Sequence, residues 1–249
     1  MPDPSDFDFD DVFSDDYTHF YGPLLGDERS DAEAELIAGL LELAPGMRVL
    51  DAACGYGRIA RRLAARGCDV VGVDRSPTFL EMARKAGGGV DYRQADMREF
   101  AADGQFDRVV SWFTSFGYFD DDANQALLAS WRRALRPGGK LLIDHQNRDR
   151  FLRAVAITPD GRPSSVVERG DDLLIDRTLF DVPTGRTHTD RISVRDGRVR
   201  RYRFSVRTFT FAELRTWLLV AGFSRVEGFG RAGEPLTLDS ARMIVVASV

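Results

Sequence analysis

The chain has 249 residues, 43% of them hydrophobic, and a formal net charge of −5, so it can bury a sizeable core but lacks the basic balance of a dedicated nucleic-acid binder. No apolar run approaches the roughly 20 residues of a membrane helix, and the acidic first residues lack the basic and apolar regions of a signal peptide, which predicts a cytoplasmic protein. The two cysteines, Cys54 and Cys68, have no metal-ligand spacing, so we expect neither a disulfide scaffold nor a metal site.

The chain begins with a segment that is both acidic and aromatic. Among the aspartates of residues 1–30 stand Phe7, Phe9, Phe13, Tyr17, Phe20 and Tyr21. This composition is too aromatic for a plain disordered tail, so we interpret the segment as an arm or lid that folds over another part of the protein. A helix is expected to start at the sequence SDAE, in which Ser30 and Glu33 match a capping box.

Strand and helix patterns alternate from residue 31 to about residue 150. The runs that read as strands are MRVLDA, CDVVGVD, VDYRQAD, FDRVVSWF and GKLLIDH. Between them, RIARRLAAR, SPTFLEMARKA and a segment ending at LRPGG read as helices. This alternation implies parallel strands joined by right-handed crossovers, and therefore a doubly wound sheet that binds its ligand at the carboxyl ends of the strands.

The pattern changes over residues 151–207, after the fifth strand. Short polar-alternating strands and turn signals such as DVPTG and RDGR predict an insertion of antiparallel hairpins there. Residues 208–249 return to one helix and two strands, which are expected to complete the core with an antiparallel edge. We therefore divide the chain into an arm (1–30), a core (31–150), a β insertion (151–207) and the C-terminal part of the core (208–249).

The stretch VLDAACGYGRIARRL places a carboxylate and two glycines between a strand and a helix. Gly55, Gly57 and Ala60 fit the spacing of a dinucleotide-binding loop, and Asp74 ends the next strand where a ribose-binding acid belongs. Asp51, however, would face the pyrophosphate of a dinucleotide and repel it. A carboxylate at this place instead favours a nucleoside whose other end is positively charged, such as S-adenosylmethionine with its sulfonium and ammonium groups.

Five segments, in order, resemble the motifs of the class I S-adenosylmethionine-dependent methyltransferases: VLDAACGYGR, VVGVDRS, YRQADMREF, FDRVVSWFTSFGYF and LRPGGKLLID. The resemblance implies an α/β, Rossmann-like fold with a doubly wound, seven-stranded, mostly parallel sheet and an antiparallel edge strand. It also implies an enzyme that uses S-adenosylmethionine to methylate nitrogen, oxygen or carbon of a small molecule, with a role in specialised metabolism.

The same resemblance implies roles for individual residues. It places the methionine part of the cofactor at Gly55 and Gly57 and the ribose hydroxyls at Asp74. It places the adenine at Asp96 and Met97. The cofactor-binding residues expected in this way, including one that closes the pocket after the fourth strand, are Tyr17, Asp51, Ala53, Gly55, Gly57, Asp74, Arg75, Asp96, Met97 and Phe113.

Two residues are candidates for catalysis. His145 ends the fifth predicted strand at the edge where the acceptor should lie, and it serves either as a general base or as a structural histidine. Tyr21, with Tyr17, lies where related enzymes place an N-terminal lid, and such phenols either narrow the methyl pocket or anchor the arm. Methyl transfer depends mainly on alignment and desolvation, so a base is not required in every case.

The insertion over 151–207 is expected to be an acceptor lid or a contact in a homodimer. Its many arginines either bind an acidic acceptor, such as a carboxylate or a nucleotide-linked sugar, or form a solvated strand face. Our interpretation is a small-molecule methyltransferase without nucleic-acid, membrane or metal partners. The alternatives are an S-adenosylmethionine-binding protein that is a cyclase, a decarboxylase or a non-catalytic subunit, and a nicotinamide-dependent oxidoreductase, which Asp51 opposes.

Overall fold

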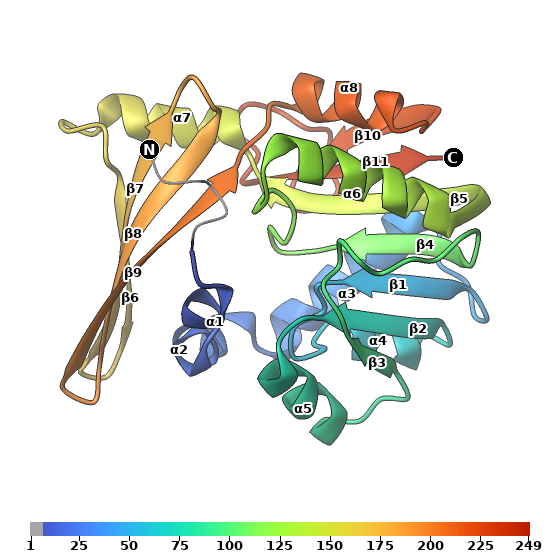
Figure 1. Ribbon diagram of the computed structural model, residues 1–249, viewed down its shortest axis with the longest axis horizontal. Helices are drawn as coiled ribbons and strands as arrows, with labels where there is room; N and C mark the ends of the chain where they lie inside the picture. Colours follow the sequence, from blue (N-terminus) through green and yellow to red (C-terminus); the bar gives the residue numbers. More distant parts are fainter. Residues whose placement is uncertain (1–6) are drawn as a thin grey trace.

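A seven-stranded sheet forms the centre of the structure, a computed structural model that describes residues 7–249 (Figure 1). Its strand order is β10-β11-β5-β4-β1-β2-β3; β1 to β5 are parallel, and β11 is antiparallel to both β5 and β10. The predicted doubly wound, mostly parallel sheet with an antiparallel edge is confirmed. The strands are β1 (Arg48–Ala52), β2 (Asp69–Asp74), β3 (Asp91–Gln94), β4 (Phe106–Ser111), β5 (Leu135–Gln146), β10 (Arg225–Phe229) and β11 (Arg242–Ser248).

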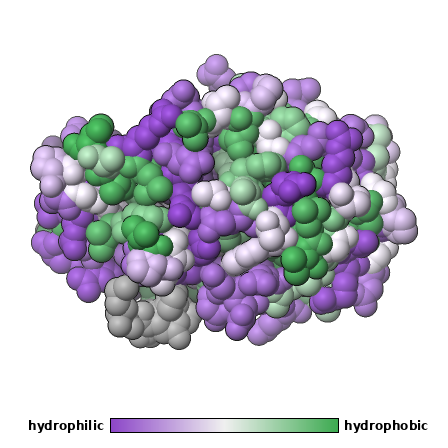
Figure 2. Space-filling view, turned by 90° about the horizontal axis from the view of Figure 1, so that it is seen from above, coloured by the Kyte–Doolittle hydropathy of each residue, from purple (hydrophilic) through white to green (hydrophobic). Residues whose placement is uncertain are grey.

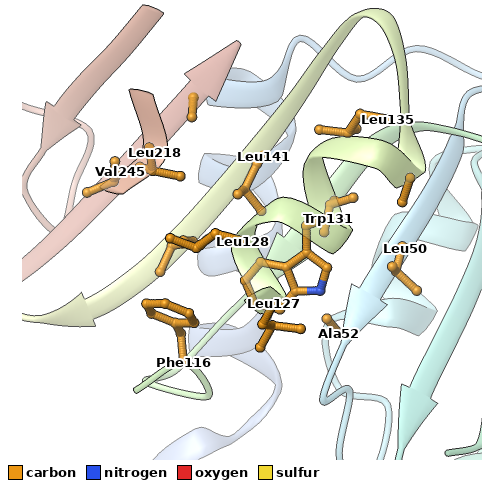
Figure 3. Packing of buried hydrophobic residues seen from close by; sticks show 14 of the residues in the cluster. Leu50, Ala52, Phe116, Leu127, Leu128, Trp131, Leu135, Leu141, Leu218 and Val245 are labelled. Atoms are coloured by element: carbon orange, nitrogen blue, oxygen red, sulfur yellow. The ribbon is translucent and has the colours of Figure 1, made fainter. Parts of the chain in front are cut away.

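Helices cover both faces of this sheet, so its central strands β1, β2, β4 and β5 are largely buried on both sides. On one face, Ile37 of α3 and Leu63 of α4 share a buried cluster with Val49 of β1. On the other face, Leu50 of β1 belongs to a second cluster with Trp131 of α6, which Figure 3 shows from close by. The helices around the sheet are α3 (Asp27–Leu41), α4 (Ala60–Ala65), α5 (Pro77–Lys85), α6 (Asp121–Ala134) and α8 (Phe211–Val220). Within residues 7–249, no helix has both the length and the apolar character to cross a membrane.

A second sheet of four antiparallel strands lies beside the first, at the left of Figure 1. Seen from above, it and α7 carry hydrophobic residues among hydrophilic ones on their surface (Figure 2). The strands, in sheet order, are β6 (Ser164–Arg169), β7 (Asp172–Asp181), β8 (Arg186–Arg195) and β9 (Arg198–Arg207). The predicted hairpins are present, but the segment before them is a helix, α7 (Arg148–Ile157), in which no residue is buried.

Residues 9–21 contain two short helices that lie between the two sheets (Figure 1). The next helix, α3, begins at Asp27 with Gly26 as its N-cap, so the predicted start at Ser30 is wrong. Ser30 is buried inside this helix, where its hydroxyl donates to the carbonyl oxygen of Leu25 at 3.0 Å. The elements before α3 are α1 (Phe9–Val12), α2 (Asp15–Tyr21) and a 3₁₀ helix (Pro23–Leu25).

Hydrogen bonds and ion pairs fasten this arm to the second sheet. The buried carboxylate of Asp16 accepts hydrogen bonds from Ser193 Oγ at 2.7 Å and from Arg195 at 3.0 Å. Burial opposes its charge, but these bonds hold the pKa of Asp16 below its ordinary value. Arg200 pairs with Asp11 at 2.8 Å. Some of the arginines that suggested an acidic acceptor therefore hold the arm in place.

Candidate active site

A cavity lies at the carboxyl ends of β1, β2 and β4, and α1 and α2 contribute to its walls. Open α/β sheets bind their ligands at this edge. In the part of the chain that the structure describes, the cavity wall includes every residue predicted to bind the cofactor except Gly57. The two candidate catalytic residues, His145 and Tyr21, do not line it. No group of three acidic, histidine or cysteine side chains suited to a metal ion occurs among residues 7–249.

The loop after β1 turns sharply because three of its residues have left-handed backbone conformations. The angle φ is 59° at Ala53, 54° at Gly55 and 75° at Gly57, which glycine adopts readily and alanine does not. Asp74 holds this loop, since its Oδ2 accepts a hydrogen bond from the Gly55 N–H at 2.7 Å. Its Oδ1 accepts one from the Ser76 N–H at 2.9 Å. Burial nevertheless raises the pKa of Asp74. The acid at the end of β2 therefore has two roles in the structure: it shapes the loop, and it lines the cavity.

Asp51, in β1, is a buried acid with an unused oxygen. Its side chain lines the cavity, the residue is 2% exposed, and Oδ2 has no hydrogen-bond partner among the described residues. Burial raises the pKa of Asp51 to about 7, against the attraction of Arg58. A carboxylate oxygen without a partner suits a cationic ligand and opposes a pyrophosphate. These residues therefore fit S-adenosylmethionine.

The residues after β2 and β3 add two charged groups and an apolar side chain to the wall, Arg75, Asp96 and Met97. The guanidinium of Arg75 lies 4.7 Å from the ring centre of Phe9. Asp96 accepts hydrogen bonds from the Arg98 N–H at 2.9 Å and from its guanidinium at 2.6 Å. Burial opposes the charge of Asp96, but Arg98 holds its pKa below the ordinary value. An adenine amino group would therefore share this carboxylate with Arg98.

The loop after β4 contains two successive residues in left-handed conformations, Phe113 and Thr114, each with a φ of 60°. Asp144 holds both, because its Oδ2 accepts from the Phe113 N–H at 2.9 Å and its carbonyl accepts from the Thr114 N–H at 3.0 Å. Arg242 donates to both carboxylate oxygens of Asp144 at 2.8 Å and to Thr114 Oγ1 at 2.6 Å. Sequence reasoning missed Arg242, since 98 residues separate it from Asp144.

Aromatic side chains of the arm and of the loop after β4 form one wall of the cavity. The ring of Phe13 lies 5.7 Å from that of Tyr17 and 5.6 Å from that of Tyr118. Burial raises the pKa of Tyr17, and that of Tyr118 to about 12, so both phenols keep their protons at neutral pH. Tyr21 accepts a hydrogen bond from Arg191 of the second sheet at 3.0 Å. This contact supports Tyr21 as an anchor of the arm and not as a catalytic residue.

His145, the candidate base, is completely buried outside the cavity. Its Nε2 lies 3.1 Å from the carbonyl oxygen of Phe116, and its Nδ1 lies 3.2 Å from that of Gln146. Burial lowers the pKa of His145 to about 4, so the ring is neutral at neutral pH. Successive side chains of a strand point to opposite faces: the Asp144 carboxylate reaches Phe113, which lines the cavity, whereas the His145 ring reaches Phe116, which does not. The geometry supports a structural histidine and does not support a general base.

We expect His145→Phe to lower stability while leaving cofactor affinity nearly unchanged. The substitution removes both ring nitrogens beside buried carbonyl groups, which costs about 1–3 kcal/mol, and the cavity keeps its lining. Thermal unfolding measures the first effect, and calorimetric titration with S-adenosylhomocysteine measures the second. A variant of unchanged stability that had lost turnover on an identified acceptor would restore His145 as the base.

The glycine loop also carries residues that sequence reasoning did not single out. Tyr56 and Arg58 line the cavity. Gly57, in contrast, faces away from it, since a Cβ there would lie 2.2 Å from Tyr92 Oη. Position 57 therefore requires glycine because Tyr92 packs against it, and not because the methionine part of the cofactor needs the space. Arg58 follows the loop directly and could have been noticed, but its partner Glu33 lies 25 residues upstream.

Comparison with known proteins places this site among methyltransferases. Residues 49–139 match the family described as "Methyltransferase domain". A glycine/sarcosine N-methyltransferase of Parasynechococcus marenigrum is 28% identical over 232 residues, which cover 88% of this chain and 78% of the relative. Ubiquinone biosynthesis O-methyltransferases of several bacteria also match. The one from Xanthomonas euvesicatoria is 33% identical over 49% of this chain, and the match spans about half, 52%, of that relative's length.

Solved structures share the fold over almost the whole chain. The CcbJ methyltransferase from Streptomyces caelestis has a TM-score of 0.78 at 22% identity, and the match covers 94% of this chain and 96% of the CcbJ chain. A second solved structure is that of S-adenosylmethionine-bound CalS10, an amino pentose methyltransferase from Micromonospora echinaspora involved in calicheamicin biosynthesis. Its TM-score is 0.62 at 21% identity, and the match covers 89% of this chain and 90% of the CalS10 chain. The family match over residues 49–139, the fold shared with solved methyltransferases and a cavity suited to a cationic nucleoside agree, and together they support a class I S-adenosylmethionine-dependent methyltransferase.

Proposed function

We propose that this methyltransferase transfers the methyl group of S-adenosylmethionine to the nitrogen of a small-molecule amine. The observation that carries the proposal is the aromatic wall of the cavity, formed by Phe13, Tyr17 and Tyr118. The similarity to a protein named glycine/sarcosine N-methyltransferase supports it. The similarity to CalS10, which takes part in calicheamicin biosynthesis, supports extending the proposal to specialised metabolism.

In this proposal the cofactor lies along the carboxyl ends of β1, β2 and β4. Asp51 attracts the sulfonium and the α-ammonium group of the cofactor, and Asp74 accepts hydrogen bonds from the ribose hydroxyls while it holds Gly55. Asp96 and Met97 receive the adenine. Positive charge beside Asp51 favours its ionised form, so cofactor binding lowers the pKa of this carboxyl from about 7.

The aromatic wall suits an acceptor that becomes a cation. Tyr17 and Tyr118 keep their protons at neutral pH, so neither phenol takes a proton from a hydroxyl acceptor. Their rings present electron-rich faces, which stabilise an ammonium product through cation–π interactions. When bound, S-adenosylmethionine supplies a methyl carbon that the nitrogen lone pair attacks as the sulfur–carbon bond breaks, and the extra proton on nitrogen passes to water. The residues of the cavity contribute alignment and exclusion of water.

Methyl transfer from radiolabelled S-adenosylmethionine to matched pairs of small molecules tests this proposal. The two members of a pair differ only in carrying an amine or a hydroxyl group, and we expect label in the amine members. Tyr118→Phe should retain activity because it keeps the ring, whereas Tyr118→Leu should lose about 3- to 30-fold with the cation–π interaction. Label confined to the hydroxyl members, or equal activity of the two variants, would contradict the proposal.

A further inference from the structure

Three buried polar atoms of residues that line the cofactor cavity have no hydrogen-bond partner within residues 7–249. They are Asp51 Oδ2, Tyr56 Oη and Arg58 Nη2, and all three residues line the cavity. Buried polar atoms in proteins almost always have a partner, because leaving one unpaired costs free energy. Two donors and one acceptor without partners at one cavity therefore indicate a ligand that brings both an anionic and a cationic group.

One nitrogen of the Arg58 guanidinium pairs with an acid, and another, Nη2, has no hydrogen-bond partner in the described part of the chain. Its Nη1 donates to Glu33 Oε2 and lies 3.4 Å from Ser30 Oγ. Glu33 also accepts hydrogen bonds from Trp112 Nε1 and Arg29 Nε, each at 2.8 Å. Burial opposes the charge of Glu33, but Arg58 and these donors hold its pKa below the ordinary value. The network fixes the position of the Arg58 guanidinium and leaves Nη2 for a further acceptor.

We propose that Arg58 binds the α-carboxylate of S-adenosylmethionine, with Tyr56 as a second donor and Asp51 opposite them at the α-ammonium group. An amino acid carries both charges on one carbon, which matches one buried cation and one buried anion at the same cavity. Charge-assisted hydrogen bonds from a fixed guanidinium are among the strongest in proteins, and they offset the cost of burying Arg58. The inference rests on the cofactor and not on the nature of the acceptor.

Calorimetric titration with three nucleosides tests the assignment without any acceptor. S-adenosylhomocysteine carries both charges, its decarboxylated analogue keeps only the ammonium group, and 5′-methylthioadenosine has neither. We expect the wild-type protein to prefer S-adenosylhomocysteine to the decarboxylated analogue by about 10- to 100-fold. Arg58→Gln should abolish this preference while its affinity for 5′-methylthioadenosine changes by less than about threefold.

Two further variants keep the test decisive. Tyr56→Phe removes only a hydroxyl group, so it should fold and should weaken S-adenosylhomocysteine about 3- to 10-fold without affecting 5′-methylthioadenosine. Arg66→Gln is the matched control, because Arg66 follows α4, pairs with Glu35 and does not line the cavity. The assignment is overturned if the wild type does not discriminate against the decarboxylated analogue, or if Arg58→Gln weakens all three nucleosides equally. Failure of the amine proposal would leave these titrations unchanged.

Discussion

Gly57→Ala should destabilise the protein by about 2–5 kcal/mol, because the added methyl group has no room. The Cβ would lie 2.2 Å from Tyr92 Oη, 2.9 Å from its Cζ and 3.1 Å from the Cβ of Ala83. The ring of Tyr92 is also confined by Gly72, where a Cβ would lie 2.9 Å from Tyr92 Cδ1. The φ of 75° at Gly57 adds backbone strain for any residue with a side chain.

Gly55→Ala separates the two causes, and denaturant unfolding measures both variants. Gly55 has a similar φ of 54°, but the nearest atom to a Cβ there is Phe79 Cδ2 at 3.9 Å, so this control should lose only about 1–2 kcal/mol. Adding Tyr92→Phe to Gly57→Ala should recover part of the loss, since it removes a buried hydroxyl that has no partner within the described residues. If Gly57→Ala instead kept full stability and lost only cofactor affinity, the glycine would be required by the cofactor.

The central sheet could be predicted because its parallel strands β1, β2, β4 and β5 contain apolar runs that are buried on both faces; the edge strand β3, with the sequence DYRQ, is largely exposed. Acids at or next to the ends of these strands, such as Asp51 and Asp74, could therefore be predicted to lie at one edge. The direction of a side chain near a strand end is harder to predict, since it depends on register and twist. His145 and its neighbour Asp144 share that edge, yet Asp144 holds Phe113 at the cavity, whereas His145 contacts Phe116 outside it.

Contacts between distant segments could not be predicted from local patterns. Ser30 and Glu33 match a capping box in the sequence. In the structure, however, the helix has Gly26 as its N-cap, Ser30 lies inside it, and Glu33 pairs with Arg58. The helix α7 escaped prediction for another reason. Its apolar residues Phe151, Leu152 and Val155 are only partly buried, and this short stretch is assigned from sequence to the hairpins that follow it.

Arg242→Met should destabilise the protein by about 3–5 kcal/mol at pH 7, because it leaves a buried charge without its partner. Asp144 is 2% exposed, and Arg242 donates to both of its carboxylate oxygens. Burial raises the pKa of Asp144 above the ordinary 3.8 even with the guanidinium present, and it should rise further in the variant. A protonated carboxyl needs no cation, so the loss should be small near pH 4 and should grow as the pH rises toward 7.

Denaturant unfolding at pH 4 and pH 7 measures this difference. Arg225→Met is the matched control, since Arg225 and its partner Glu227 are exposed on β10, and the loss there should stay within about 1 kcal/mol. Adding Asp144→Asn to Arg242→Met should recover most of the loss at pH 7, because the amide oxygen can still accept from the Phe113 N–H without carrying charge. Equal losses at both pH values would contradict the electrostatic explanation and would point instead to packing, since the Arg242 guanidinium also lies 5.8 Å from the Phe113 ring centre.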